Sequence, residues 1–153
     1  MCHLILTDEL DTSTISIPSP FENNNNIDLS ISQDNKPKIK VDISNGSPYV
    51  TTDITITAQI LSINSGNSRL TPQLVNELES SARQYLTDQI YNYYYKTSKD
   101  FNSDISGVGQ YALKNFKTIQ EWNDYNWLSN YSSCTFKVNL NLSLESGYIL
   151  TSE

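Results

Sequence analysis

The feature that most constrains the fold is a strict alternation of apolar and polar residues near the end of the chain. Polar residues occupy the odd positions from 135 to 143, and the apolar members are Cys134, Phe136, Val138, Leu140, Leu142 and Leu144. Because successive side chains of a strand point to opposite faces, this pattern predicts a β-strand with one apolar face. Such a strand requires neighbouring strands and a second layer that covers the apolar face.

Four earlier segments alternate in the same way and are expected to be strands, namely residues 14–17, 27–31, 38–44 and 49–63. The last two are separated by the turn sequence Asn45-Gly46-Ser47-Pro48, so we expect them to pair antiparallel. β-branched residues are frequent in the longest segment, which also favours a strand.

One long amphipathic helix is predicted from residue 72 to about residue 97. Thr71 offers a hydroxyl N-cap, and Pro72 suits the first helical position. The apolar stripe recurs every fourth residue, at Leu74, Leu78, Ala82, Leu86 and Ile90. Short helices are expected over residues 111–116 and 118–122, the second with a threonine cap.

These elements predict a single α+β domain over residues 1–153. We expect an antiparallel or mixed β-sheet, with one long helix and shorter helices packed on one face. The strands do not alternate singly with helices, which argues against a doubly wound nucleotide-binding sheet.

Charge argues against nucleic acid as a partner, and hydropathy argues against a membrane-spanning segment. A net charge of −7 argues against a phosphate-binding surface, so nucleic acid is not expected as a partner. The longest apolar runs fall far short of the roughly 20 residues that cross a bilayer. Residues 1–9 lack the basic stretch of a secretion signal. The isolated chain is therefore expected to be soluble and not to bind liposomes.

Catalytic and metal-binding side chains are scarce. His3 is the only histidine and is expected in a frayed terminus, so a triad is not predicted. Cys2 and Cys134 with one histidine make a poor metal set, and Cys134 fits a small buried hydrophobe. We predict no catalytic residue, no cofactor and no metal.

The segment Asp104-Ile105-Ser106-Gly107-Val108-Gly109 indicates a backbone constraint. A dinucleotide-binding loop would need a preceding strand and a third glycine, whereas here a helix precedes and Ala112 occupies the third position. We expect Gly107 or Gly109 to have positive φ or to lack space for a Cβ. Asp104 is expected to cap the next helix or to bind the amides of the loop rather than to act in catalysis.

Aromatic residues gather around this segment. Four tyrosines, Tyr91, Tyr93, Tyr94 and Tyr95, must cover most of the helix circumference. Core packing or surface cover is the simpler interpretation, and a docking patch is the alternative. Trp122 and Trp127 are interpreted first as core anchors and second as a ligand-stacking pair.

The order of these motifs resembles the C-terminal domain of the Ger(x)C family, the lipoprotein C subunits of spore germinant receptors. The resemblance runs from residue 38 to residue 150 and rests on Leu70-Thr71-Pro72, the segment Asp104 to Gly109, the two tryptophans and a closing strand that ends in Gly147. Ser106 departs from the family, in which a bulky apolar residue is usual at that position.

The resemblance implies a non-enzymatic domain of a germinant receptor C subunit that acts through protein contacts in nutrient-triggered spore germination. It implies integral-membrane A and B subunits as partners, on the outer face of the spore inner membrane. The membrane would be reached through a lipid anchor outside this chain. The family's lipoprotein signal and N-terminal domains are not found in the sequence, so we expect a fragment, a truncated product or a stand-alone domain.

A small-molecule-binding α+β domain, with a pocket between helix and sheet, is the alternative function, and an enzyme ranks third. A closed core with tyrosines on an outer ridge would favour the receptor subunit. A deep pocket at Trp122 or Trp127 would favour the small-molecule binder.

Overall fold

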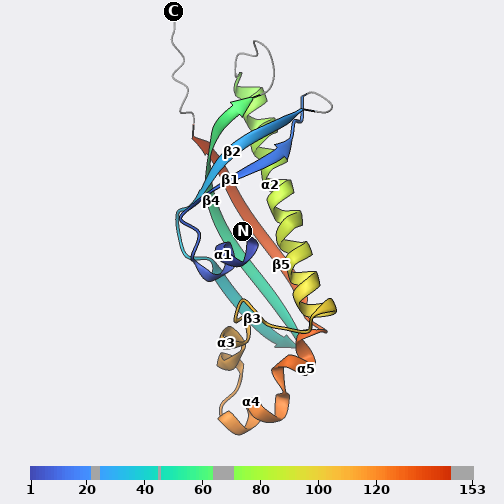
Figure 1. Cartoon of the computed structure of the whole chain (residues 1–153). Helices are drawn as coiled ribbons and strands as arrows, with labels where there is room; N and C mark the ends of the chain where they lie inside the picture. The colour runs from blue at the N-terminus through green and yellow to red at the C-terminus, as the bar shows by residue number, and fades with distance from the viewer. Residues whose placement is uncertain (22–24, 45, 64–70, 146–153) are drawn as a thin grey trace, which may run out of the picture.

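The computed structural model describes residues 1–21, 25–44, 46–63 and 71–145 (Figure 1). Its strands are β1 (Thr12–Pro18), β2 (Asn26–Gln33), β3 (Lys38–Ser44), β4 (Ser47–Ile63) and β5 (Thr135–Glu145). Its α-helices are α1 (Cys2–Thr7), α2 (Pro72–Tyr95), α3 (Gly109–Ala112), α4 (Ile119–Tyr125) and α5 (Trp127–Tyr131). A π-helical turn (Lys96–Asp100) extends α2, and a 3-10 turn (Leu113–Asn115) follows α3.

The long strand β4 organises the sheet. On one of its edges, β3 pairs antiparallel with residues 47–53 and β2 pairs antiparallel with residues 56–63. β5 runs parallel to residues 49–59 and must therefore lie on the other edge. β1 pairs with β2. The predicted α+β class is confirmed, and the sheet is mixed because β5 is parallel to β4.

Helix α2 covers the apolar face of β5 (Figure 1). It begins as predicted, because the Thr71 hydroxyl accepts a hydrogen bond of 3.3 Å from the Leu74 N–H. The residues of its buried stripe are Leu78, Ala82, Leu86, Ile90 and Tyr94. The helical path continues through the π-turn to Asp100, slightly beyond the predicted end.

The register of β5 follows the predicted alternation. Val138, Leu140 and Leu142 are buried, while the intervening Asn139 and Asn141 are exposed. Phe136 is only half-buried, because it lies near the start of the strand at the end of the sheet. The second layer expected to cover the apolar face of this strand therefore covers it only in part at Phe136.

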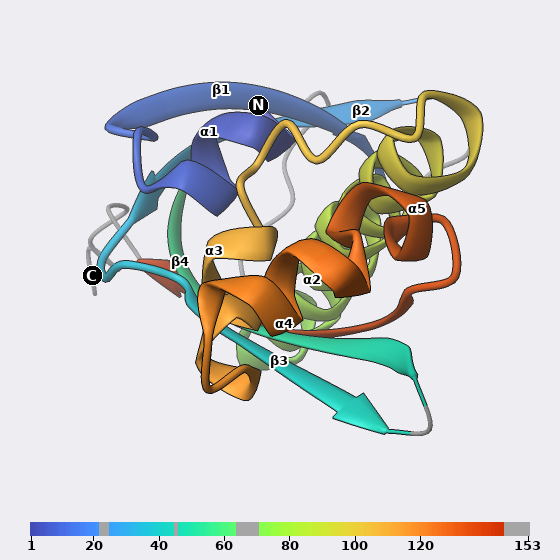
Figure 2. The same cartoon turned by 90° about the horizontal axis from the view of Figure 1, so that it is seen from below.

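The short helices α3, α4 and α5 gather at the end of the molecule where β3 and β4 meet (Figure 2). The threonine cap of α4 is confirmed, since the Thr118 hydroxyl accepts a hydrogen bond of 3.1 Å from the Glu121 N–H. Helix α3 begins at Gly109 rather than at residue 111, and α5 was not predicted.

The expectation of a frayed N-terminus was wrong. Residues Cys2–Thr7 form α1, in which Ile5 and Leu6 are buried in the core. The Gln33 side chain also donates a hydrogen bond of 3.1 Å to the Ile5 carbonyl, which ties the helix to β2. A helix this short is unstable alone, so its order comes from burial of these two side chains.

Candidate functional site

The Asp104 carboxylate is the centre of the loop that follows α2. One oxygen, Oδ1, accepts a hydrogen bond of 2.8 Å from the Val108 N–H. The other, Oδ2, accepts hydrogen bonds from the Gly109 N–H at 2.6 Å and from the Trp127 indole N–H at 2.8 Å. The side chain thus binds the amides of the loop, as predicted, and also holds α5 against it.

Both positions of the motif require glycine for a structural reason. Gly107 has a φ of +67°, the left-handed region that favours glycine. A Cβ on Gly109 would lie 2.7 Å from Trp127 Nε1 and 2.8 Å from its Cδ1, so there is no room for one. The predicted backbone constraint is confirmed at both positions, by conformation at the first and by close approach at the second.

Ser106, where the resemblance leads us to expect a bulky apolar residue, has a polar partner. Its buried hydroxyl lies 2.7 Å from the Tyr93 hydroxyl, which in turn lies 3.2 Å from His3 Nδ1. His3 thus belongs to a chain of three polar groups that joins α1, α2 and the loop. Burial raises the pKa of Tyr93, and its hydrogen bond to Ser106 opposes that rise.

Aromatic side chains form one continuous cluster from α2 to α4. Tyr94 stacks on Phe136 with ring centroids 4.3 Å apart, and Trp127 stacks on Trp122 at 6.0 Å. Tyr131 contacts both Phe136 and Trp127 and so joins the two stacks. Trp127 is only 6 % exposed and Trp122 is half-buried, which fits the interpretation of both as core anchors.

The buried tyrosines of this cluster have hydroxyl partners. The Tyr94 hydroxyl lies 2.9 Å from Thr52 Oγ1, and the Tyr131 hydroxyl lies 3.2 Å from Thr97 Oγ1. Burial raises the pKa of both tyrosines well above its usual value, so they are neutral hydrogen-bonding groups at any physiological pH.

Cys134 is buried beside this cluster, as predicted. Burial, with a smaller contribution from the Asp104 charge, raises the pKa of its thiol to about 12. A protonated and buried thiol is a poor nucleophile, so Cys134 fits a packing role. Cys2 is half-buried, and burial raises the pKa of its thiol as well.

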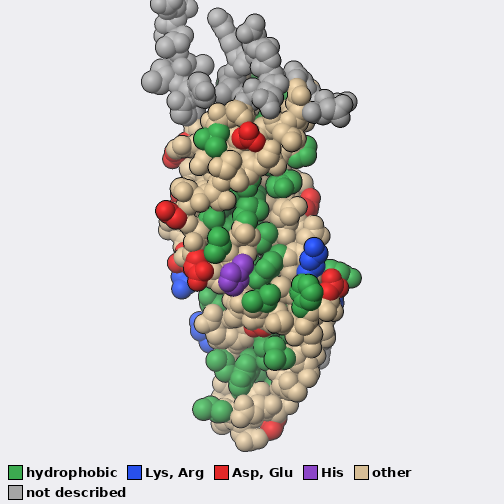
Figure 3. Space-filling view, in the orientation of Figure 1, with side chains coloured by type: hydrophobic (Ala, Val, Ile, Leu, Met, Phe, Trp, Pro, Cys, Tyr) green, Lys and Arg blue, Asp and Glu red, His purple; other side chains and the backbone are tan. Residues whose placement is uncertain are grey.

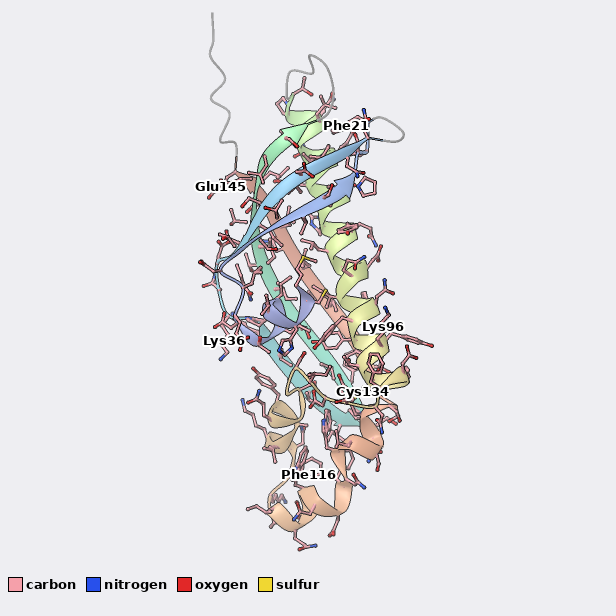
Figure 4. The ribbon with its side chains drawn as sticks, viewed as in Figure 1. Phe21, Lys36, Lys96, Phe116, Cys134 and Glu145 are labelled. Carbon is pink, nitrogen blue, oxygen red and sulfur yellow. The ribbon has the colours of Figure 1, made fainter. Side chains whose placement is uncertain are left out.

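Several aromatic residues stay on the surface where α2 ends. Tyr91 is 38 % exposed, Tyr95 is 59 % exposed and Phe101 is 66 % exposed. We call these three residues the aromatic ridge. A cavity of about 320 Å³ lies beside it, lined in part by Tyr91, Tyr95 and Cys134. Figure 4 labels Lys96 and Cys134, which mark the end of α2 and the start of β5 in this region.

The ridge is one part of a surface with many apolar side chains. Hydrophobic side chains also gather on the face drawn in Figure 3, down to the end that carries α3 and α4.

A second cavity, of about 710 Å³, lies on the sheet. Neither cavity is lined by Trp122 or Trp127, so neither is the tryptophan pocket that a small-molecule binder would need.

Within the described ranges, no cluster of three or more His, Cys, Asp or Glu side chains is placed to hold a metal ion. The helices in those same ranges include none that is long and apolar enough to span a bilayer.

Comparison with known proteins places this geometry in a family. Residues 2–147 match the model of the family described as Spore germination B3/GerAC like, C-terminal. The crystal structure of the GerBC protein has the same fold, with a TM-score of 0.74 at 13% sequence identity. The match covers 94% of this chain and 43% of that one, so the chain spans less than half the length of GerBC. A search of curated proteins found no match.

Proposed function

Because the chain belongs to the Spore germination B3/GerAC like, C-terminal family, we propose that it is a domain of a spore germinant receptor C subunit. It acts through protein contacts, not through catalysis, in the response of the spore to nutrients. Its partners are the integral-membrane A and B subunits, on the outer face of the spore inner membrane. A lipid anchor outside this chain holds the subunit there.

The observation that carries the non-enzymatic role is the use of the Asp104 carboxylate. It is the acid in the most distinctive motif of the chain, yet both of its oxygens are engaged by Val108, Gly109 and Trp127. A general acid or base must exchange a proton with a substrate, whereas three of the roughly four acceptor positions of this carboxylate are occupied by N–H groups of the scaffold. The motif therefore supports a role in shaping the domain.

The aromatic ridge supports the contact role. Tyrosine and phenylalanine are enriched in protein interfaces, and three of them at the end of one helix expose a large apolar area. The π-turn that carries the chain from Tyr95 to Phe101 is fixed from inside, because Thr97 and Ser98 donate hydrogen bonds to carbonyls of α2. The ridge is thus presented on a rigid support, which lowers the entropic cost of binding.

The test uses a spore former that carries the full-length gene. Deletion of this domain should abolish or delay germination by the nutrients of that receptor and leave growth normal. Substitution of Tyr95 and Phe101 by serine should weaken the same response, while Leu61→Ser, at an exposed apolar residue near the opposite end of β4, should not. The level of the subunit is measured by immunoblot. Normal germination after the deletion would exclude the proposal.

A further inference from the structure

The face of the sheet that α2 leaves uncovered holds the cavity of about 710 Å³. Its floor includes Thr55, Asn139 and Asn141, which project from β4 and β5 away from the core. Lys36 and Lys38 line one side, and Arg83 of α2 lines the other. We call this cavity the sheet groove.

The side chains that line the sheet groove carry more positive than negative charge. The chain has a net charge of −7, yet three of its ten Lys and Arg residues line this one groove. Within the described residues none of the three forms an ion pair, and the groove's Asp53 instead accepts a hydrogen bond of 2.7 Å from Asn139. Arg83 Nε is buried and has no hydrogen-bond partner there. A buried donor without an acceptor is costly, so the Arg83 guanidinium, which lines the groove, favours an anionic ligand.

The groove continues onto the free edge of β5, the edge opposite β4. Side chains of α2 bind this edge at two points: the Tyr91 hydroxyl accepts from the Val138 N–H at 3.1 Å, and Glu79 Oε1 accepts from the Leu144 N–H at 2.9 Å. Every second residue of a strand directs its N–H and C=O to the same edge. Leu140 and Leu142 therefore direct theirs to the free edge, where no protein partner is found within the described residues.

Arg83 lies on α2 between these two contacts. Glu79, Arg83, Thr87 and Tyr91 follow one another in steps of four, so they share the side of the helix that faces the edge of β5. The open part of the edge, residues 139–143 between these two contacts, is about 16 Å long at about 3.3 Å per residue. That length suits a strand of about five residues.

We propose that the edge around Leu140 and Leu142, together with Arg83, is a docking site for an extended acidic peptide segment of a partner protein. The peptide adds a strand to β5, and its main chain exchanges hydrogen bonds with Leu140 and Leu142. An acidic side chain of the peptide pairs with Arg83. The inference deepens the proposed contact role and rests on it.

The edge groups distinguish a peptide from other anions. A lipid headgroup or a free phosphate provides acceptors for Arg83, but it has no row of alternating donors and acceptors for the N–H and C=O groups of β5. A peptide in extended conformation provides both.

The test is a titration of the ¹⁵N-labelled chain, followed by NMR, with a synthetic peptide that alternates glutamate and valine. A peptide that alternates lysine and valine, inorganic phosphate and anionic vesicles of phosphatidylglycerol serve as comparisons. The acidic peptide should shift the amide signals of Leu140 and Leu142 and slow their hydrogen exchange. Arg83→Gln should weaken its binding about tenfold, whereas Lys114→Gln, an exposed cation away from the groove, should not. Circular dichroism checks that both variants are folded.

Three results with the peptides would overturn the inference. They are an absence of shifts at millimolar acidic peptide, an equal response to the lysine peptide, and unchanged binding by the Arg83→Gln variant. If phosphate or the vesicles alone reproduce the shifts, the groove is an anion or lipid site and the peptide proposal is wrong. None of these results bears on the germination test, so the two proposals can fail separately.

Discussion

The indole N–H of Trp127 donates a hydrogen bond of 2.8 Å to the Asp104 carboxylate and so joins α5 to the loop that follows α2. The same carboxylate accepts the N–H groups of Val108 and Gly109 at the start of α3. One side chain thereby connects three segments of the lower end of the molecule. Hydrogen bonds to a carboxylate are stronger than those between neutral groups, so the connection is energetically significant.

Replacement of Asp104 by asparagine should destabilise the domain by about 1–3 kcal/mol. The amide has one acceptor oxygen instead of two, and its NH₂ group cannot accept the second set of N–H donors. The free energy of unfolding in urea measures the effect. Asp124→Asn is the matched control, because Asp124 is exposed and its partner Gln120 lies in the same short helix. Equal stability of the two variants would contradict the role given to Asp104.

Replacement of Gly109 by alanine should be more damaging than the same change at Gly107. The new Cβ at position 109 would overlap the buried indole ring of Trp127, and such overpacking costs about 1–3 kcal/mol. At position 107 the Cβ meets only the flexible end of Gln110 at 3.0 Å, so the cost is mainly the strained φ, about 1 kcal/mol. Urea unfolding and the tryptophan emission spectrum measure both. A larger loss of stability for Gly107→Ala than for Gly109→Ala would show that the Trp127 side chain moves aside easily.

Local patterns in the sequence were enough to predict much of the fold. The period of two in residues 134–144 fixed which side chains of β5 are buried, and Thr71-Pro72 fixed the start of α2. In both places the controlling interaction lies within a few residues. The constraint at Gly107 and Gly109 was also predicted, because a position with positive φ, or without room for a Cβ, favours glycine, and the glycine is visible in the sequence.

The contacts between distant segments could not be predicted. No local pattern shows that β5 is parallel to β4, since the choice of strand partner depends on the whole sheet. The Trp127 indole that fills the space at Gly109 comes from another helix. The order of α1 comes from burial of Ile5 and Leu6, and the apolar run Leu4-Ile5-Leu6 was the available signal. The sheet groove was missed because its cations come from three places in the chain, namely α2, the turn between β2 and β3, and the start of β3.

Replacement of Tyr91 by phenylalanine should release one end of the free edge of β5. The hydroxyl that accepts the Val138 N–H is lost, while the ring is kept. Hydrogen exchange at Val138 should become about tenfold faster, and the stability should fall by no more than about 1 kcal/mol because water can replace the acceptor. Tyr95→Phe is the control, since Tyr95 lies one helical turn beyond Tyr91 and is 59 % exposed. Unchanged exchange at Val138 would show that this hydrogen bond does not protect the edge.

The domain should lose stability at alkaline pH, and Cys134 should account for part of the loss. Burial raises the pKa of its thiol from 9.0 to about 12, so the folded protein keeps the proton that an unfolded chain releases above about pH 9. The contribution of this protonated thiol to the free energy of unfolding is fully present below pH 9. It declines as the pH rises toward 12, by at most about 1.4 kcal/mol per pH unit. The buried hydroxyls of Tyr94 and Tyr131, whose pKa values are also raised, act in the same direction above pH 10. Urea unfolding at pH 8, 9 and 10 should show a steeper decline for the native chain than for Cys134→Ala, which has no thiol to titrate. Parallel declines would mean that the thiol ionises alike in both states and is not buried as described.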